Sequence, residues 1–375
     1  MKVLVTGGAG FIGTHLCRRL LREGWQVSIL DNFNPQIHPH GQQLSADLAT
    51  DIELFVADVR DRAAMYHALE GCDALVHLAA ETGTGQSMYE VSRYEGVNVG
   101  GTAHLMDYLM NARDSRIQRI VVASSRAVYG EGKYFCETHG VVYPKERLVE
   151  DMDAGNFEPR CPRCPSFCRP LPTDEGAPYQ PTSFYGLTKQ IQEQMILLFA
   201  KARGIAAYAL RFQNVYGPGQ SLSNPYTGVL AVFAGQARQG KPIYVFEDGE
   251  ESRDFVYVQD VVEATVKALK TPQEGVYTVN IGSGQPTTLR EVAERINHFF
   301  GNRSLIKITG SYRLGDIRHN IADLRRAKEL LDYEPRWSFP MGLQNFLRWA
   351  ETHHEEAQGY EESLQQMRQR GLMRG

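Results

Sequence analysis

The stretch TGGAGFIG, residues 6–13, follows the apolar run Val3 to Val5 and precedes an amphipathic segment. Its glycines at positions 7, 10 and 13 have distinct uses in a strand–turn–helix unit. The first permits a tight turn, the second lets the backbone approach a pyrophosphate, and the third permits close packing of helix on sheet. Amide groups at the start of the helix favour the diphosphate. The stretch therefore predicts a dinucleotide-binding turn at the first strand of a parallel sheet.

Short apolar runs alternate with helix-like segments over the first part of the chain, which predicts an α/β fold with a doubly wound parallel sheet of the Rossmann type. The runs expected to form buried strands are 3–5, 27–30, 54–56, 74–78, 120–123 and, further on, 206–212. The segments expected to form helices are 14–23, 62–70, 97–112 and 182–203.

Changes in composition divide the chain into domains. Residues 1–213, together with 255–275, are expected to form the dinucleotide-binding domain, and 131–175 form an insertion in it, rich in Pro, Cys and charge. Residues 214–254 and 276–350, with more Gly, Pro and aromatic residues, are expected to form a smaller α/β substrate-binding lobe. The polar end, 351–375, reads as a frayed helix or a disordered tail.

The overall charge and the cysteines restrict the partners and the compartment. A net charge of −4 leaves no basic surplus for nucleic acid as the main partner. No apolar run reaches the roughly 18 residues that span a bilayer, and the first residues lack the pattern of a signal peptide. Four of the six cysteines lie in the insertion, which favours metal binding over disulfides and predicts a cytoplasmic protein.

Acidic and small residues after the next predicted strands specify the dinucleotide. Asp31 ends the second strand, where its carboxylate can accept both ribose hydroxyls and would repel a 2′-phosphate. NAD is therefore favoured over NADP. Asp58, after the third strand, suits the adenine edge, or alternatively caps a helix starting near Arg60. Leu78 to Ala80, after the fourth strand, offer a bed of small residues.

A tyrosine and a lysine in SFYGLTK, residues 183–189, form a candidate catalytic pair. Tyr185 and Lys189 stand at i and i+4, on one face of the predicted helix. An adjacent ammonium favours the phenolate, and the same lysine can bind the nicotinamide ribose. Ser125, at the end of a strand, can hydrogen-bond the reacting oxygen and align it with the phenol.

These motifs together resemble those of the extended short-chain dehydrogenase/reductase family, the NAD-dependent nucleotide-sugar epimerases and dehydratases. The resemblance covers nearly all of residues 1–350. It rests on TGGAGFIG, ADVRD (57–61), HLAA (77–80), NVGGT (98–102), SSRAVYG (124–130), YGLTK (185–189), LRFQNVYGPG (210–219), RDFVYVQDV (253–261) and RLGDIRHNIAD (313–323).

The resemblance implies a nucleotide-sugar substrate, a homodimer formed through the helices near 97–112 and 182–203, and catalysis by Ser125, Tyr185 and Lys189. The cofactor residues expected on this basis are Gly7, Gly10, Phe11, Ile12, Gly13, Asp31, Asn32, Asp58, Val59, Leu78, Ala79, Ala80, Asn98, Tyr185 and Lys189. The substrate residues expected are Thr82, Ser87, Arg126, Asn214, Tyr244, Arg253 and Arg313, with Phe246 beside Tyr244 as a second wall for the base. For the two arginines Arg253 and Arg313, the alternative to diphosphate binding is a surface salt bridge.

Within the family, the residues after Ser125 favour an epimerase. Sugar 4,6-dehydratases carry an acidic pair there, whereas this chain has Arg126 and Ala127, which cannot supply acid and base for water elimination. Oxidation at C4 and reduction on the opposite face need only Tyr, Ser, Lys and NAD. Residues 78–90 and the insertion resemble the subfamily that interconverts dTDP-L-rhamnose and dTDP-6-deoxy-L-talose. The alternatives are a UDP-glucose or UDP-N-acetylglucosamine 4-epimerase, an NAD(P)H-dependent nucleotide-sugar reductase, and a catalytically silent NAD-binding regulatory protein.

The insertion contains two ligand pairs with the spacing of zinc knuckles. Cys136 and His139 form one pair, and Cys161 and Cys164 form the other, so that two turns direct four ligands at one point. Cys168 is a rival to His139 for the fourth position. Four protein ligands leave no open position for water, which predicts a structural zinc. The alternative is a loop with reduced thiols.

Overall fold

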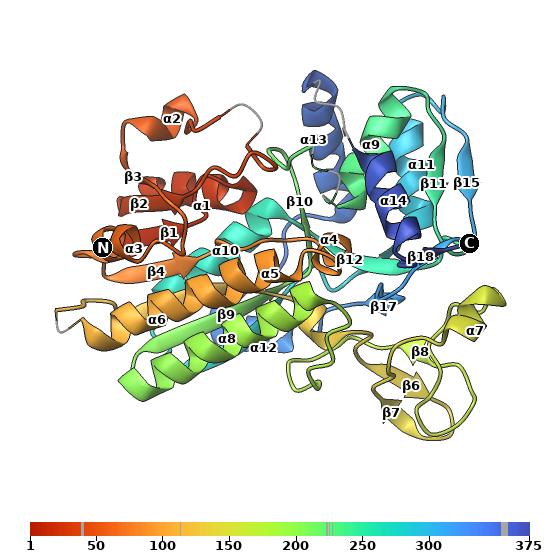
Figure 1. Cartoon of the computed structure of the whole chain (residues 1–375), viewed down its shortest axis with the longest axis horizontal. Coiled ribbons are helices and arrows are strands. Elements are labelled where there is room, and N and C mark those ends of the chain that lie inside the picture. The colour runs from red at the N-terminus through yellow and green to blue at the C-terminus, as the bar shows by residue number, and fades with distance from the viewer. Residues whose placement is uncertain (39–40, 113, 223, 225, 227, 354–358) are drawn as a thin grey trace.

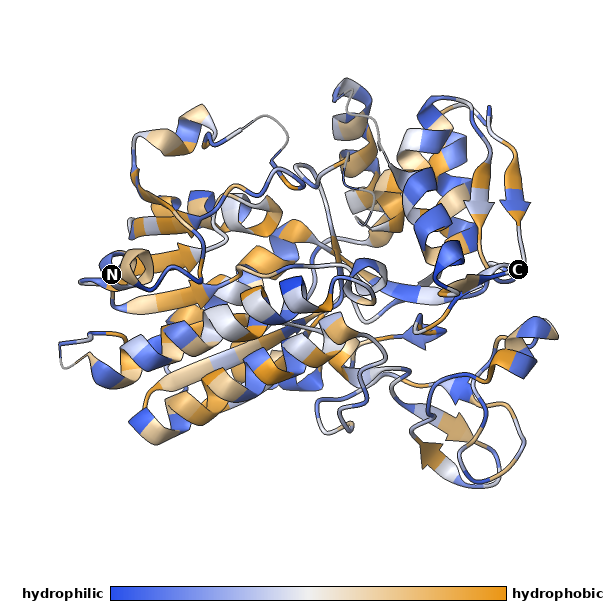
Figure 2. Ribbon diagram, in the orientation of Figure 1, coloured by the Kyte–Doolittle hydropathy of each residue, from blue (hydrophilic) through white to orange (hydrophobic). Residues whose placement is uncertain are grey.

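The computed structural model describes residues 1–38, 41–112, 114–222, 224, 226, 228–353 and 359–375. A seven-stranded sheet in the order β13-β9-β5-β4-β1-β2-β3 forms the larger part of the molecule, and its neighbouring strands are all parallel (Figure 1). Figure 2 shows these strands mostly in the hydrophobic colour, as expected for strands covered on both faces. Their bounds are Lys2–Thr6 (β1), Gln26–Asp31 (β2), Ile52–Val56 (β3), Ala74–His77 (β4), Arg119–Ser125 (β5), Ala206–Phe212 (β9) and Val276–Ile281 (β13).

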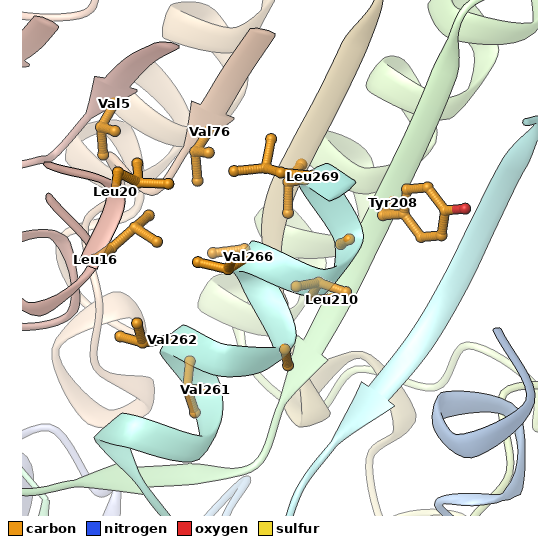
Figure 3. Packing of buried hydrophobic residues seen from close by; sticks show 14 of the residues in the cluster. Val5, Leu16, Leu20, Val76, Tyr208, Leu210, Val261, Val262, Val266 and Leu269 are labelled. Atoms are coloured by element: carbon orange, nitrogen blue, oxygen red, sulfur yellow. The ribbon is translucent and has the colours of Figure 1, made fainter. Parts of the chain in front are cut away.

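Helices cover both faces of this sheet, which confirms the predicted doubly wound arrangement. Val3 and Val5 pack in one core with α1 (Phe11–Arg22), α10 (Val258–Lys270) and α12 (Arg325–Leu331). Figure 3 shows side chains of α1 and α10 in this core. Leu4, between Val3 and Val5 in sequence, faces the other core. That core contains α3 (Arg62–Leu69), α6 (Gly101–Asn111) and α8 (Phe184–Arg203). The alternation of a strand's side chains thus places one hydrophobic core on each face.

The second lobe has its own core. Its strands β10 (Asn214–Tyr216), β12 (Ser252–Tyr257), β14 (Pro286–Thr288) and β17 (His319–Asn320) form one sheet, and β11 (Ile243–Val245) pairs with β15 (Ile306–Ile308). The helices α9 (Val229–Arg238), α11 (Leu289–Phe299) and α13 (Phe339–Thr352) supply most of the apolar side chains that pack against them. In the described part of the chain, no helix is both long and apolar enough to cross a lipid bilayer.

Two predicted domain boundaries are wrong. Strand β13, expected in the substrate lobe, is the edge strand of the large sheet beside β9, and Tyr333 belongs to the core of α1, α10 and α12. Conversely, residues 255–275 were expected in the first domain. Strand β12, which ends at Tyr257, instead pairs with β10 and β14 of the second lobe. The chain crosses back only at α10, because that helix carries the apolar face that the large sheet buries.

The insertion folds as a small antiparallel unit that lies apart from the large sheet, beside the second lobe (Figure 1). Its strands β6 (Tyr134–Cys136), β7 (Gly140–Val142) and β8 (Arg169–Pro170) form a three-stranded sheet. The short helix α7 (Val149–Asp153) lies between β7 and β8 in the chain. Its hydrophobic core consists of Tyr134, Val142 and four cysteines. A core this small needs additional stabilisation.

The end of the chain differs from the expected frayed or disordered tail. Residues Tyr360–Gln369 form helix α14, and Met373–Arg374 form strand β18, which pairs antiparallel with β16 (Tyr312–Arg313). Ser363, Met367 and Met373 are buried. The remaining short elements are α2 (Ala46–Ala49), α4 (Thr84–Ser87), α5 (Val91–Tyr94), the π-helical turn η1 (Glu95–Gly100) and the 3-10 turn η2 (Arg126–Tyr129).

Candidate active site

A cleft of about 400 Å³ lies at the carboxyl ends of β1, β2, β4 and β5. Ligands of open parallel sheets bind at this edge. The cleft brings together the glycine turn, the end of β2, the segment after β4 and the predicted catalytic residues. The predicted site residues that line it are Gly7, Gly10, Phe11, Ile12, Gly13, Asp31, Asn32, Val59, Leu78, Ala79, Ala80, Thr82, Ser125, Tyr185 and Lys189.

Two glycines of the turn have no room for a side chain. Gly7 has a φ of +71°, and a Cβ there would lie 2.8 Å from the backbone nitrogen of Ala79. A Cβ at Gly13 would lie 2.4 Å from the carbonyl oxygen of Gly7. Helix α1 begins at Phe11 without a capping side chain, so its first amide groups remain available to an anion in the cleft.

The carboxylate of Asp31 is fixed at the end of β2. It accepts hydrogen bonds from the backbone nitrogen of Ala9 at 3.0 Å and from that of Phe33 at 2.9 Å. These two bonds hold the group at the wall of the cleft, next to the glycine turn. This is the position in which a carboxylate accepts hydrogen bonds from a ribose.

The carboxylate of Asp58 is held by two neighbouring side chains, and its position at the adenine edge stays a prediction. Its carboxylate accepts from Nε of Arg60 at 2.8 Å and from Nδ2 of Asn32 at 3.0 Å, and the bond from Arg60 lowers the pKa of Asp58 to about 2. Within the described residues, Val59 rather than Asp58 lines the cleft. The alternative, a helix cap, is met in part: Asp58 accepts from the backbone nitrogen of Arg60 at 2.9 Å, but the cap of α3 is Asp61, which accepts from Ala63.

Asn98 and Ser87 likewise lie outside the lining of the two cavities described here. The buried amide of Asn98 exchanges two hydrogen bonds with the backbone of Glu81, at 2.8 and 3.1 Å, and so fixes the segment that follows β4. Ser87 donates to the carbonyl oxygen of Thr84 at 2.6 Å within the turn of α4. Both side chains are fully buried, and neither is among the residues that line the two cavities.

Ser125 and Tyr185 meet where β5 and α8 converge. Ser183 caps α8 by accepting from the backbone nitrogen of Gly186 at 3.1 Å, which places Tyr185 in the first turn. Burial raises the pKa of Tyr185, and the hydrogen bond with Ser125 and the charge of Arg126 oppose that increase. The phenol is therefore close to both a hydroxyl and a cation.

Lys189 is buried and belongs to a chain of hydrogen bonds across the large sheet. Its Nζ donates to Oε1 of Gln192 at 2.5 Å, Nε2 of Gln192 lies 3.0 Å from Nε2 of His77, and Nδ1 of His77 lies 2.7 Å from Oγ1 of Thr6. Burial lowers the pKa of Lys189 to about 7. Lys189 thus pairs with Gln192, and Arg126 is the cation whose charge opposes the increase in the pKa of Tyr185.

A second cavity, of about 200 Å³, adjoins the first. Consecutive residues alternate between the two, with Ser125 and Gln213 in the first and Arg126 and Asn214 in the second. The predicted substrate residues that line the second cavity are Arg126, Asn214, Tyr244, Phe246, Arg253 and Arg313. Thr82 lines the first cavity instead.

Three arginines give the second cavity a positive character. Nε of Arg126 donates to Oδ1 of Asn214 at 2.8 Å, and burial together with Arg253 lowers the pKa of Arg126 to about 10. Arg253 pairs with Asp316 at 3.0 Å. Burial would raise the pKa of Asp316, but Arg253, Arg313 and Arg126 lower it to about 2.

Arg313 keeps a donor free. Its guanidinium lies 4.9 Å from the ring centroid of Phe246, and its buried Nε has no hydrogen-bond partner among the described residues. A buried donor without a partner is costly, so it marks a place where a ligand acceptor fits. The surface salt bridge considered for this residue is absent from the described contacts.

Sequence reasoning missed several lining residues. Gln213 is buried, lines the first cavity, and has no partner for either amide atom among the described residues. Its place beside Asn214 in LRFQNVYGPG was the available signal. Tyr360, Ser363 and Met367 line the second cavity from α14, and nothing in their polar segment pointed to it.

The insertion assembles the four predicted metal ligands. The ligand atoms of Cys136, His139, Cys161 and Cys164 all lie within 4.8 Å of one another, and Cys168 lies outside this group. Sγ of Cys136 lies 3.7 Å from Sγ of Cys164 and 3.6 Å from Nδ1 of His139, which is 3.5 Å from Sγ of Cys161. Tetrahedral zinc with Zn–S of about 2.3 Å and Zn–N of about 2.0–2.1 Å separates two sulfurs by about 3.8 Å and sulfur from nitrogen by about 3.6 Å. The donor set therefore fits zinc.

Comparison with known proteins agrees with this geometry. A family model described as "NAD dependent epimerase/dehydratase family" matches residues 3–147 and 165–282, leaving a gap inside the insertion. The dTDP-L-rhamnose 4-epimerase of Burkholderia thailandensis is 40% identical over 351 residues, which cover 93% of this chain and 94% of that enzyme.

Solved structures extend the likeness to ligand complexes. MoeE5 in complex with UDP-glucuronic acid and NAD matches with a TM-score of 0.74 at 28% identity, covering 93% of this chain and 99% of that one. The UDP-glucose 4-epimerase of Thermotoga maritima with UDP-glucose matches with a TM-score of 0.73 at 27% identity, covering 93% and 98%.

Proposed function

Because this chain belongs to the NAD-dependent epimerase/dehydratase family, we propose that it interconverts dTDP-L-rhamnose and dTDP-6-deoxy-L-talose. The class of the reaction is NAD-dependent 4-epimerisation of a nucleotide sugar, and the particular sugar and base are what is proposed. The observation that carries the proposal is the 40% identity to a dTDP-L-rhamnose 4-epimerase along almost the full length of both chains.

The residues of the cleft fit each step of an epimerisation at C4. Bound NAD supplies the hydride acceptor and, in the second half of the reaction, the hydride donor. Tyr185 takes the proton of the C4 hydroxyl when C4 is oxidised, and it returns that proton to the C4 oxygen when the hydride is delivered to the opposite face of C4. Ser125 orients that oxygen. Lys189 lines the same cleft, which supports its proposed role as the residue that binds the nicotinamide ribose. Its buried side chain exchanges Gln192 for that partner.

The second cavity suits the remainder of the substrate. Arg126, Arg253 and Arg313 offer the charge that a diphosphate requires, and a forked guanidinium matches phosphate oxygens. Arg126 also stands where dehydratases carry an acid. With Ala127 beside it, the position offers neither general acid nor base, which favours epimerisation over elimination.

The insertion supports a second part of the proposal, a structural zinc held by Cys136, His139, Cys161 and Cys164. All four ligand atoms lie within 4.8 Å of one another, and three of their separations, 3.5 to 3.7 Å, are close to those around a tetrahedral zinc. Four protein ligands would leave no position for water. Metal binding would then stabilise a unit whose hydrophobic core is otherwise too small. We propose no catalytic role for this metal.

A homodimer formed through α6 and α8 is the third part. Phe184, Leu187 and Leu198 share one face of α8 and are 38%, 40% and 70% exposed, and Met110 at the end of α6 is 48% exposed. Such a row of apolar side chains on two adjacent helices favours burial against a second copy.

A panel of nucleotide sugars tests the proposed substrate. Purified protein, without added cofactor, is incubated with dTDP-L-rhamnose, UDP-glucose, UDP-N-acetylglucosamine and UDP-glucuronic acid, and the products are resolved by NMR. We expect dTDP-6-deoxy-L-talose from the first and bound NAD in the purified protein. Turnover of only UDP-sugars would favour the alternative 4-epimerases. Activity that requires and consumes NADPH would instead establish a reductase.

A further inference from the structure

The C-terminal segment, residues 359–375, packs over the second cavity although its sequence is polar. Helix α14 directs Tyr360, Ser363 and Met367 at the cavity, and Ser363 and Met367 are buried there. The opposite face of the helix, which includes Gln365, is exposed. The helix is therefore amphipathic with respect to the cavity, which Tyr360 and Met367 both line.

Contacts on both sides hold α14 in place. The guanidinium of Arg370 lies 4.6 Å from the ring centroid of Tyr89, which follows α4. Met367 packs against Gly85 of α4 so closely that a Cβ at this glycine would lie 3.1 Å from Sδ. The helix thus spans the space between the segment after β4 and the second lobe.

The strand that follows α14 supports Arg313 directly. In β18, Met373 is paired with Arg313 of β16, and the backbone nitrogen of Leu314 donates to the carbonyl oxygen of Leu372 at 2.9 Å. Arg313 carries the buried Nε that lacks a partner and lines the same cavity. The end of the chain therefore fixes the backbone from which this guanidinium extends.

The chemistry of the cavity wall suits a nucleoside diphosphate. Arg126, Arg253 and Arg313 provide positive charge. Tyr360 of α14 and Tyr244 of β11 each provide an aromatic ring. Tyr244 and Tyr360 also both line a third cavity, of about 390 Å³, so the two rings stand at the outer end of the charged site, next to that cavity. Aromatic rings at the outer end and cations further in match a nucleobase followed by its phosphates.

We propose that the C-terminal segment is the outer wall of the nucleotide-sugar site, in which Tyr360 and Met367 contact the nucleotide and β18 positions Arg313. The inference rests on the proposed function, since it assigns residues to the same substrate. It adds a binding element that lies outside every motif of residues 1–350.

Isothermal titration of the NAD-loaded full chain with dTDP, and separately with UDP, tests this assignment. Tyr360→Ala and Met367→Ala remove the proposed contacts, Tyr360→Phe restores the ring, and Gln365→Ala is the matched control on the exposed face of α14. We expect dTDP to bind about tenfold more weakly to the two alanine variants in the cavity. Tyr360→Phe and Gln365→Ala should bind like the wild type.

Two further measurements separate a binding role from a structural one. KM for the nucleotide sugar should rise in Tyr360→Ala while kcat stays within about twofold and the NAD content is unchanged. Wild-type affinity in both cavity variants would overturn the inference, as would loss of NAD together with dTDP binding. If the wild-type protein bound neither dTDP nor UDP, the proposed function itself would be refuted. This outcome is distinct from failure of the inference, in which the wild type binds dTDP and the cavity variants bind it equally well.

Discussion

The guanidinium of Arg147 in the insertion lies 2.8 Å from the carboxylate of Glu247 in the second lobe, and both side chains are almost completely buried. Arg147 also donates to the carbonyl oxygen of Asp316 at 2.9 Å, and Glu247 pairs with Arg318 at 2.8 Å. Breaking a buried pair leaves an uncompensated charge. The insertion is thereby connected to Asp316, which pairs with Arg253 and follows Arg313 closely in the chain.

This connection predicts the effect of zinc loss. Cys161→Ser should remove about one zinc per chain, lower the melting temperature, and raise KM for the nucleotide sugar while bound NAD is retained. The reason is that the insertion contacts the second lobe, whereas the proposed NAD site lies at the glycine turn and Asp31. Elemental analysis, thermal melts and steady-state kinetics provide the three readouts.

Cys168→Ser is the matched control for the metal site. Its thiol is buried in the same core but lies outside the four-ligand group, so zinc should be retained. Zinc loss in this variant would make Cys168 a ligand in place of His139. Metal-free wild-type protein of unchanged stability would refute the structural zinc, and release of NAD by a chelator would place the insertion on the cofactor side.

Replacement of the catalytic phenol should abolish most turnover. Tyr185→Phe keeps the ring but removes the oxygen that exchanges the proton, so kcat should fall by roughly two or more orders of magnitude. Binding of dTDP and NAD should survive. Tyr277→Phe, on the distant edge strand β13, should keep normal turnover. Near-normal kcat in Tyr185→Phe would require another acid–base residue.

The buried lysine predicts a pH-dependent stability in protein freed of NAD. Burial lowers the pKa of Lys189 from an ordinary 10.5 to about 7. Between these values the unfolded chain binds more protons than the folded one, so the unfavourable contribution is complete below about pH 7 and disappears as pH rises towards 10.5.

Lys189→Met should therefore gain thermal stability relative to the wild type at pH 7, and the gain should shrink between pH 7 and pH 10, taken as about the limits of that window. Lys201→Met, an exposed lysine on the same helix, should show no such trend. Melting temperatures at several pH values measure the difference. A gain that is independent of pH would contradict the low pKa of Lys189.

Loss of the free guanidinium donor should weaken binding of the diphosphate. Arg313→Ala should raise the dissociation constant for dTDP by about tenfold to a hundredfold, and Arg313→Lys should recover part of the loss because it keeps the charge without the fork. Arg295→Ala, exposed on α11, is the control. Unchanged dTDP affinity in Arg313→Ala would place the diphosphate elsewhere.

An acidic residue in the apolar row of α8 should separate the subunits. Leu198→Glu should shift the protein from dimer to monomer in light scattering, whereas Leu305→Glu, which is equally accessible but lies in the second lobe, should leave the dimer intact. A monomeric wild type would remove the proposal.

Features that depend on residues close together in the chain could be predicted from the sequence. The glycine spacing of residues 6–13 is such a feature, because the positive φ of Gly7 and the close approach of Gly13 to the carbonyl oxygen of Gly7 both arise within the turn. The same holds for Tyr185 and Lys189, whose common face follows from helical periodicity, and for the two Cys/His pairs of the insertion. These are the residues that the structure brings together as expected.

Contacts between segments far apart in the chain could not be predicted from the sequence and are known only from the folded structure. Lys189 donates to Gln192, which in turn contacts His77. Asp58 is held by Arg60, and the polar end of the chain pairs with the strand that contains Arg313. The physical reason is that a side chain's partner depends on which other groups the packed cores bring near it. Period and composition report whether a residue is buried, whereas the pairing of buried charges and of strands such as β16 and β18 is set by the fold as a whole.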